Sequence, residues 1–569
     1  MKPIKSTFAV LGSLLALSQA GAAVVGPASG AVDGVQPATV LDVNPAGIGH
    51  VNLVPYFSVR SGFDTYLNLT NTDTRNGKAV KLRFRSGYNG EDIGNFTVLL
   101  GPGDVWAAAI TRDAATGYPR VVHGDRSCTL PADVQTTLGS IYQGRVNSSG
   151  NENPTPSLDG SVEIITLADI PQLTSGGQVA ALHAAVTVSG GTAVPTCSAA
   201  ALDPLASDSG SYADARSKGL EVPTSGLMTQ WTLINVPRAV SYSGRATAVE
   251  ARVAANGSPG YGNIVLFPQT SEQVVDEART KAYTTNPNIR GGARENKDGV
   301  AGSVFPNGGQ SYVQHQFPDL STPYLPAGLS GALGPGVAPR LQAFAVSKAL
   351  AATSIGGEFV TDPGLLAKTD WLVSLPTRYL QVGYIPESLF NVLPSATYTN
   401  LTVDDAGAPV GNGVKNFFQS DVNAQLDPYS GIYPMCVSGI DPYANGTANP
   451  GQPQTATGFR AREGSSITLQ TPPPVGGIQV PFRLCGHSSV LRFARPGADA
   501  ADGVLGDVRN RWPMISSSTA GWGRIQIPGV AGQGLPIIGF AVSELYNSAV
   551  KPGTAGVFGV TFPLSTTRP

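Results

Sequence analysis

The segment Cys485-Gly-His-Ser-Ser-Val490 comes closest to a catalytic motif in this sequence. In a nucleophile elbow, a strand delivers a serine into a tight turn that leads directly into a helix, and small residues let that turn close. Here the second glycine is missing and no helical pattern follows. We therefore interpret the segment as a polar hairpin turn beside a disulfide, and we assign no catalytic residue.

Histidine, the commonest general base, is scarce in the chain. The five histidines show neither HExxH nor i,i+4 spacing: His50, His123, His183, His315 and His487. This scarcity argues against a hydrolase that uses a histidine base. The sequence therefore predicts a protein that is not an enzyme.

Two groups of acidic residues could hold a hard cation such as calcium, which prefers carboxylate and carbonyl oxygens. They are the pair Asp404-Asp405 and the loop residues Asp499, Asp502 and Asp507. Neither group follows the EF-hand spacing, and we favour solvated loops. Structural calcium is the one alternative to a protein without cofactors, and the metal-ligating residues stay unassigned.

The four cysteines are an even, small number, which in an exported chain favours two disulfides. They are Cys128, Cys197, Cys436 and Cys485, and three connectivities are open to them. We favour the sequential pairs Cys128–Cys197 and Cys436–Cys485, because each would close one loop-rich insertion. A metal site is the alternative, but the sequence has no CxxC pair and no histidine at ligand spacing.

Five tryptophans raise the question of a platform on which sugar rings stack: Trp106, Trp231, Trp371, Trp512 and Trp522. The first three lie inside apolar strand patterns, so core packing explains them better.

The N-terminus reads as a secretory signal. Lys2 and Lys5 form a positive start, Phe8–Leu17 is apolar, and Ala20-Gly-Ala22 is a small-residue cleavage site. The apolar run is too short to span a bilayer. We expect residues 1–22 to be a signal peptide and the mature chain to begin near Ala23.

Composition points to a neutral, polar surface. Charged residues make up 13% of the chain, about half the usual share for soluble domains. The net charge of −2 gives no excess of positive charge that would attract nucleic acid or an anionic membrane. A surface of low charge is suited to packing against neighbouring molecules.

The stretch Val51–Thr111 carries the clearest strand signals. Leu67 and Leu69 alternate with polar residues, as Val80, Leu82 and Phe84 do further on. Such alternation sends apolar and polar side chains to opposite faces of a sheet. The turn sequences between the runs are Ser61-Gly62, Arg75-Asn76-Gly77 and Gly101-Pro-Gly-Asp104. Five short strands in this stretch predict a mainly β fold with one or more immunoglobulin-like β-sandwich cores, long loop-rich insertions and a few short helices.

The predicted domain organisation is discontinuous. After the signal peptide, residues 23–46 form an extended arm. The sandwich core or cores take 47–170, 219–283, 339–400 and 486–569, and the loop-rich insertions take 171–218, 284–338 and 401–485. Within the first insertion we expect 198–218 to be an exposed loop. We also expect the opening strands to form half of a sandwich that the closing strands, 523–562, complete.

Several blocks of this sequence resemble one family in their order: Leu53–Phe57, Asn71–Arg85, Leu100–Trp106, Trp231–Val236, Glu358–Asp362, Thr369–Trp371 and Gly523–Phe562. The chain resembles secreted cell-surface proteins of proteobacteria, chiefly β-proteobacteria, that are described as surface-layer proteins. The resemblance covers both ends and the middle but not 284–338 or 403–477. It implies a surface array or coat and no known catalysis, and it carries over no functional residues.

Composition and resemblance agree on a structural function. We expect a secreted protein that self-assembles as a homo-oligomeric lattice, a surface layer, on the outer face of a Gram-negative envelope. Outer-membrane lipopolysaccharide or an outer-membrane anchor would hold it. The alternatives are a secreted polysaccharide-binding protein or hydrolase, and a monomeric surface adhesin.

Overall fold

The computed structural model describes most of the predicted strand-forming chain. Apart from gaps of one to four residues, it covers 23–27, 30–132, 157–172, 180–188, 194–266, 345–378, 453–470, 482–497 and 503–569, with shorter pieces at 134, 382–383, 399–400, 417–418, 436–437, 440 and 442. The predicted signal peptide, the predicted insertion 284–338 and most of the predicted insertion 401–485 lie outside these residues.

Seven antiparallel strands form the first sheet, in the spatial order β10-β7-β6-β11-β4-β14-β2. Their bounds are β10 Cys128–Leu130, β7 Asp92–Leu100, β6 Gly77–Ser86, β11 Asp159–Ile170, β4 Val51–Ser58, β14 Thr247–Arg252 and β2 Val40–Asn44. β6 and β11 pair along a register that ends with Ile170 opposite Gly77.

The second sheet has six strands in the order β13-β12-β5-β8-β9, with β3 also paired to β12. Their bounds are β13 Val240–Arg245, β12 Leu227–Asn235, β5 Phe63–Asn71, β8 Val105–Arg112, β9 Pro119–Val122 and β3 Ile48–Gly49.

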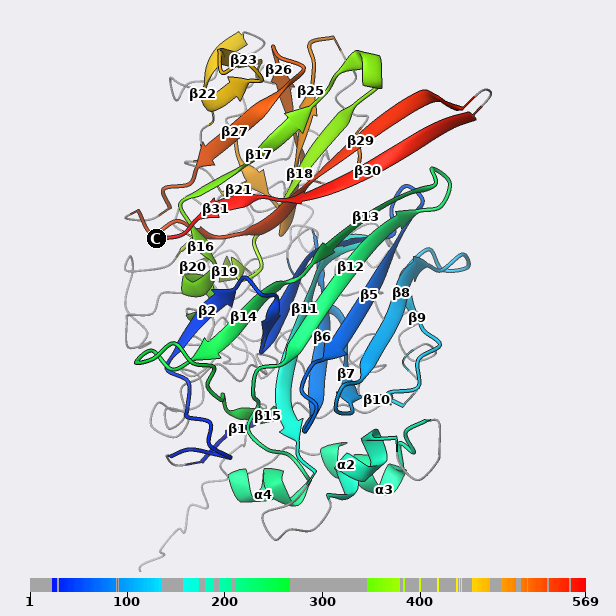
Figure 1. Cartoon of the computed structure of the whole chain (residues 1–569), viewed down its shortest axis with the longest axis vertical. Coiled ribbons are helices and arrows are strands. Elements are labelled where there is room, and N and C mark those ends of the chain that lie inside the picture. The colour runs from blue at the N-terminus through cyan, green and yellow to red at the C-terminus, as the bar shows by residue number, and fades with distance from the viewer. Residues whose placement is uncertain are drawn as a thin grey trace, which may run out of the picture.

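The third sheet has ten strands, in the order β30-β29-β18-β25-β26-β23-β22-β27-β17-β31, and lies at the other end of the molecule (Figure 1). Their bounds are β30 Thr554–Pro563, β29 Ile538–Lys551, β18 Lys368–Ser374, β25 Ser488–Ala494, β26 Arg511–Ser516, β23 Ser466–Gln470, β22 Pro453–Ala461, β27 Ala520–Gln526, β17 Ser354–Val360 and β31 Ser565–Thr567. β25 and β26 run parallel, and the other ladders of this sheet are antiparallel.

Short elements complete the described fold. Four two-stranded pairs are β1 Ala23–Val25 with β15 Ile264–Leu266, β16 Ala351–Ala352 with β28 Leu535–Pro536, β19 Val382–Gly383 with β20 Thr399–Asn400, and β21 Cys436–Val437 with β24 Leu484–Cys485. The helical elements are α2 Ala181–Val186, α3 Ala199–Leu202, η2 Asp203–Ala206, α4 Tyr212–Ser217 and η5 Pro363–Leu365. Residues 345–350 are also helical.

The first hydrophobic core lies between the first two sheets and follows the alternation in the sequence. On β5, Leu67 and Leu69 are buried in this core, whereas Tyr66 points outward and is 39% exposed. Removing such alternate apolar side chains from water is the main driving force for stacking two sheets.

Two neighbouring strands near one edge of the third sheet contribute to two cores at once. Leu372 on β18 and Phe540 on β29 pack in the first core, while their neighbours Trp371 and Ala541 pack in the second. Successive residues of a strand point to opposite faces of the sheet. One face of the third sheet therefore packs on the first core, and its other face packs on the second core. The three sheets are therefore built around cores that share strands.

The expectation of a mainly β fold with a few short helices is confirmed. The chain is mainly β with sandwich-like antiparallel sheets, and Val51–Thr111 forms five strands, β4 to β8. The closing strands contribute Phe540 and Val542 to the first core. In the described chain, however, the ladder partners of β4 to β8 all lie within residues 48–252, so the closing strands cover the opening block without pairing with it.

One local prediction is wrong. Residues 198–218 were expected to form an exposed loop, but they contain α3, η2 and α4. The Ser211 side chain accepts a hydrogen bond from Asp214 N and caps α4, as serine does at helix N-termini. Leu202, Leu205 and Ala215 are buried against the end of the first sheet, which offsets the weak helix propensity of a Ser- and Asp-rich segment.

Candidate functional site

The first sheet buries charged side chains on its polar face. The strand β6 was expected to show one polar face, yet Lys81, Arg83 and Arg85 on that face are all at most 3% exposed, and Lys78, which alternation sets on the other face, is fully buried. Nε of Arg83 and Nε of Arg85 each lie 3.1 Å from Glu163 Oε2 on β11. Buried charges persist in proteins when they are paired in this way.

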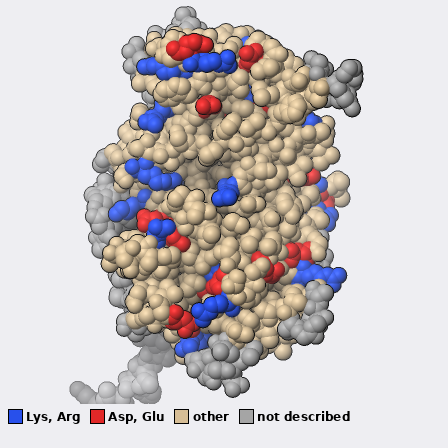
Figure 2. Space-filling model, in the orientation of Figure 1, with Lys and Arg blue, Asp and Glu red and all other residues tan. Residues whose placement is uncertain are grey.

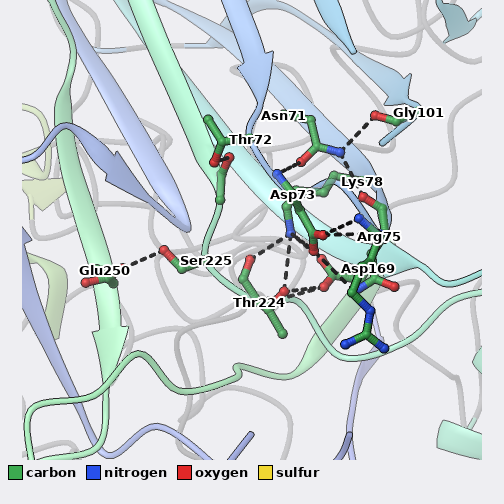
Figure 3. Close-up of polar contacts among 12 residues, drawn as sticks. Asn71, Thr72, Asp73, Arg75, Lys78, Gly101, Asp169, Thr224, Ser225 and Glu250 are labelled. Carbon is green, nitrogen blue, oxygen red and sulfur yellow. Dashed lines mark hydrogen bonds and ion pairs between the residues drawn. The ribbon is translucent and has the colours of Figure 1, made fainter. Parts of the chain in front are cut away.

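The most enclosed of these groups is the Lys78 cluster, which consists of Lys78, Asp169, Thr224 and Asp73 (Figure 3). Lys78 at the start of β6 stands directly opposite Asp169 near the end of β11. Their side chains are 0% and 2% exposed, and Nζ lies 2.7 Å from Asp169 Oδ1. An amine and a carboxyl group are thus held in contact away from bulk water.

Thr224, in the segment that leads to β12, contacts both partners. Lys78 Nζ donates to Thr224 O at 3.0 Å. Thr224 N donates to Asp169 Oδ2 at 3.2 Å, and the Thr224 hydroxyl donates to the same oxygen. The two carboxyl oxygens are therefore distinct: Oδ1 faces the lysine, and Oδ2 receives two hydrogen bonds from Thr224.

Asp73 is the fourth member of the cluster and also faces the lysine. Its Oδ2 is 4.0 Å from Lys78 Nζ and its side chain is 18% exposed, while its Oδ1 accepts from Arg75 N at 2.8 Å. Asp73 thus caps the turn before β6, as aspartate commonly does, and faces the lysine as well. Asn71 braces the same turn by donating from Nδ2 to Asn76 O at 2.9 Å.

The backbone near the cluster is fitted to the lysine. Gly226 has φ +143°, and a Cβ on it would lie 3.0 Å from Lys78 Cε. Ser225 next to it donates from Oγ to Glu250 Oε1 at 2.5 Å, and Glu250 Oε2 lies 2.7 Å from Arg252 Nη2. These contacts fix the segment that carries Thr224.

Burial sets the charge state of the neighbouring groups. Burial raises the pKa of Asp169, and the nearby Lys78 partly offsets that rise. Burial, assisted by the charge of Lys78, lowers the pKa of His50 to about 3. His50 is therefore neutral at physiological pH, and its Nδ1 accepts a hydrogen bond from Ala251 N at 3.1 Å.

Sequence reasoning missed the Lys78 cluster. It predicted the β6 strand and the turn before it but assigned no role to Lys78 or Asp169, which lie 91 positions apart. The sequence signal for this cluster is a lysine at the start of a strand with alternating apolar residues. Only the order of strands in the sheet shows which carboxylate that lysine contacts.

The predicted pairing of Cys128 with Cys197 is confirmed. Cys128 and Cys197 form a disulfide across a sequence separation of 69, which ties β10 to the segment after α2. Cys485 is also disulfide-bonded, and the β21–β24 register sets Cys436 opposite it.

The Cys485–Val490 segment forms a buried turn against the first sheet. Gly486 has φ +75°, and His487 Nε2 lies 2.7 Å from Ser161 Oγ on β11. Burial lowers the pKa of His487 well below its usual value. Ser488 Oγ lies 3.0 Å from Ser374 Oγ, and the Ser489 hydroxyl donates to Cys485 O. These side chains are hydrogen-bonded to structural partners and join the third sheet to the first.

The predicted acidic sites are largely outside the described residues, since Asp404, Asp405, Asp499 and Asp502 are not among them. The side chain of Asp507 is 83% exposed, and its Oδ1 lies 3.2 Å from Arg511 Nη1. In the part of the chain that is described, no group of three or more His, Cys, Asp or Glu is arranged to hold a metal ion.

The first three tryptophans lie where the sequence predicted them, in the core. Trp106, Trp231 and Trp371 are buried, which confirms the prediction of core packing, and Trp512 is buried too. Trp522 on β27 is 49% exposed. It stands between Glu358 on β17 and Arg460 on β22.

The most prominent surface feature is the hairpin of β29 and β30, which reaches out at one side of the molecule (Figure 1). We call it the arm. Phe558 and Phe562 on β30 are 50% and 45% exposed, and Val550 near the tip is 48% exposed. In the view of Figure 2, broad areas without charged side chains separate the charged groups.

Among the helices that the structure describes, none combines the length and hydropathy needed to cross a membrane. Comparisons of this chain with protein-family models, with curated proteins and with solved structures found no match.

Proposed function

We propose that this chain is a structural cell-surface protein without enzymatic activity, secreted by a Gram-negative bacterium, that self-assembles into a surface layer on the outer membrane. The proposal includes an immunoglobulin-like character for the sandwich sheets and loop-rich insertions between their strands. Outer-membrane lipopolysaccharide or an outer-membrane anchor would hold the layer. No cofactor and no nucleic acid takes part.

The observation that carries self-assembly is the unprotected edge of the arm. β30 is the terminal strand of the third sheet, and its one ladder partner among the described strands is β29. An edge strand presents unpaired N–H and C=O groups that can extend a sheet into another chain. Soluble proteins usually guard such edges with charges, bulges or prolines within the strand.

β30 has little of this protection. Its sequence, Thr-Ala-Gly-Val-Phe-Gly-Val-Thr-Phe-Pro, has no charged residue, and its proline comes last. β13 packs against β30 beside Gly559, where a Cβ would lie 2.7 Å from Tyr242. Phe558 and Phe562 point to the face of β30 opposite to the one that Gly559 presents to β13. Both rings are exposed on that face. We take a second copy of the chain to be the partner, because an uncharged edge strand pairs well with another of its kind.

The composition of the surface supports the same assignment. A chain with 13% charged residues has few groups that would repel identical neighbours in a dense layer. Closed or lattice assemblies of identical subunits use such self-complementary patches repeatedly.

A secreted polysaccharide-binding protein is the second candidate, and the exposed Trp522 favours it. Glu358 and Arg460 flank this ring on neighbouring strands, and an aromatic face between polar groups suits a sugar ring. Binding of a soluble polysaccharide that is lost in Trp522→Ala, by a protein that stays monomeric, would favour this candidate over the layer.

The layer is tested by electron microscopy of the cell envelope and by sedimentation of the purified mature protein. We expect a regular array on cells and large assemblies in solution. A smooth envelope, with the protein soluble in the medium, contradicts the proposal.

The arm is tested with a matched pair of lysine substitutions. Phe558→Lys places a charge on the exposed edge strand, whereas Val105→Lys replaces a residue of the second sheet that is 43% exposed. We expect Phe558→Lys to shift the protein at least tenfold towards monomer at equal concentration and Val105→Lys to assemble normally. Equal assembly of both variants would remove the arm from the contact.

A further inference from the structure

We propose that Lys78 and Asp169 become joined by an intramolecular amide bond, an isopeptide crosslink that forms within the folded chain. The crosslink would run from Nζ of Lys78 on β6 to Cγ of Asp169 on β11. It does not depend on the surface-layer function, although a crosslinked sheet suits a protein exposed outside the cell.

The two groups already have the geometry of a reacting pair. Lys78 Nζ lies 2.7 Å from Asp169 Oδ1, which brings the nitrogen beside the carboxyl carbon that it must approach to about 3–3.5 Å for attack. The register of β6 and β11 sets the two residues opposite each other. The sheet therefore holds them together and gives an effective concentration far above that of free groups.

Burial favours the uncharged form of the carboxyl group that the reaction needs. The side chains are 0% and 2% exposed, and a dry site disfavours charged groups. Burial raises the pKa of Asp169. Transfer of one proton from the ammonium to the carboxylate turns the ion pair into a neutral amine beside a neutral acid, with no change in net charge.

The other contacts in the Lys78 cluster fit the bond-forming step. The amine lone pair attacks Cγ, and negative charge develops on Asp169 Oδ2. This oxygen already accepts hydrogen bonds from Thr224 N, at 3.2 Å, and from the Thr224 hydroxyl. Donors fixed in advance at a developing oxyanion lower the barrier, as in an oxyanion hole.

Asp73 is placed to move the proton. Its Oδ2 lies 4.0 Å from Lys78 Nζ, and it can accept a proton from the nitrogen and return it to Oδ1, which leaves as water. One C–N bond forms and one C–O bond breaks, so the amine and the acid give an amide and one water molecule. Neither an oxidant nor an external cofactor is required. The 18% exposure of Asp73 gives that side of the cluster access to solvent.

Intact mass spectrometry of the folded mature protein tests the crosslink directly. After reduction of the disulfides and denaturation, we expect a mass about 18 Da, one water, below that calculated from the measured N-terminus. Proteolysis should release one branched peptide that joins the segments of Lys78 and Asp169. The full calculated mass, or a loss of water located at other residues, would overturn the proposal.

Variants separate the crosslink from a plain ion pair. Lys78→Arg keeps a cation opposite Asp169 but removes the nucleophile, so we expect the full mass. The matched control Lys218→Arg, a substitution outside the cluster, should keep the loss of water. A loss of water that persists in Lys78→Arg contradicts the proposal. If Lys78→Arg does not fold, the mass of the unaltered protein still decides.

The role of Asp73 is tested by rate. Asparagine also caps turns of this kind, so Asp73→Asn should fold while its proton transfer is impaired. We expect the uncrosslinked fraction to persist at least tenfold longer after synthesis than in the unaltered protein. An unchanged rate would remove Asp73 from the reaction. The same measurements on Phe558→Lys separate crosslinking from assembly, because the crosslink should form fully in that variant.

Discussion

Arg238 and Glu544 form an ion pair although they stand 306 positions apart in the sequence. Arg238 lies in the turn between β12 and β13 of the second sheet, and Glu544 lies on β29 of the third. The same carboxylate accepts a hydrogen bond from Tyr242 Oη at 2.9 Å, and Arg238 Nη1 donates to Val504 O at 3.0 Å. These contacts fasten the third sheet to the sandwich beneath it.

Replacement of Glu544 by alanine should weaken that junction. The change leaves Arg238 and Tyr242 without their acceptor in a mostly enclosed place, which costs about 1–3 kcal/mol of unfolding free energy. Urea unfolding followed by tryptophan fluorescence measures it. The matched control is Asp507→Ala, which removes an ion pair whose carboxylate is 83% exposed and should cost no more than about 0.5 kcal/mol. Equal losses in both variants would contradict a structural junction at Glu544.

Phe540 should be among the most sensitive positions of the closing strands. Its ring lies 4.5 Å from that of Trp231, centroid to centroid, inside the first core. Phe540→Ala leaves a cavity there and should cost about 3–5 kcal/mol. Phe558→Ala removes a half-exposed ring from β30 and should cost much less. Thermal unfolding of the two variants compares the positions.

Deletion of residues 520–569 tests how far the opening strands depend on the closing ones. Without β29 the first core loses Phe540 and Val542 and becomes exposed along one side. We expect limited proteolysis to cut the truncated chain within β4 to β8, which the full chain protects. A truncated chain with an intact, protease-resistant N-terminal core would refute this dependence.

Loss of the Cys128–Cys197 disulfide should destabilise the helical segment at the end of the first sheet. Opening a loop that spans 69 positions raises the entropy of the unfolded chain and should cost about 2–4 kcal/mol. We expect Cys197→Ser to unfold at a lower temperature and to be cut first between α2 and α4. An unchanged midpoint would show that packing alone holds this segment.

Acid should destabilise the protein through His50. Its pKa is lowered from 6.5 to about 3 in the folded state, first by burial and then by the charge of Lys78 where that amine is not crosslinked, whereas the unfolded chain titrates near 6.5. Between these values the unfolded state binds one more proton. The free energy of unfolding therefore falls as the pH falls through this window, by about 1.4 kcal/mol per pH unit for this group.

The variant His50→Gln isolates that contribution. Glutamine keeps an acceptor for Ala251 N but does not titrate, so the slope of stability against pH should decrease by about one proton between pH 6 and pH 4. A slope remains because burial also lowers the pKa of His487. Urea unfolding at several pH values gives both slopes, and identical slopes would contradict the assignment to His50.

The sequence predicted local structure well where one strand carries its own signal. The alternation of Leu67 and Leu69 with polar residues predicted β5, and the turn at Asn76-Gly77 predicted where β6 begins. The helices within 198–218 were not predicted, because their own composition favours a loop. Burial of Leu202 and Leu205 stabilises them in the folded chain.

The Lys78 cluster shows the limit of such reasoning. Alternation predicted that Lys81, Arg83 and Arg85 share a face, but a strand's own residues do not show what covers that face, and all three are buried. The contact between Lys78 and Asp169 depends on β11 pairing with β6, a choice among many possible strand neighbours. Long-range pairing of this kind is the part of the fold that a single sequence leaves open.

The strands shared between two cores also bear on how this chain reaches its native state. β18 pairs with β29 in a register that sets Lys368 opposite Glu544, so neither core can close until residues synthesised much later have arrived. Topologies dominated by such distant pairings fold slowly. The first and second cores would therefore stay open during synthesis until the C-terminal strands have been made.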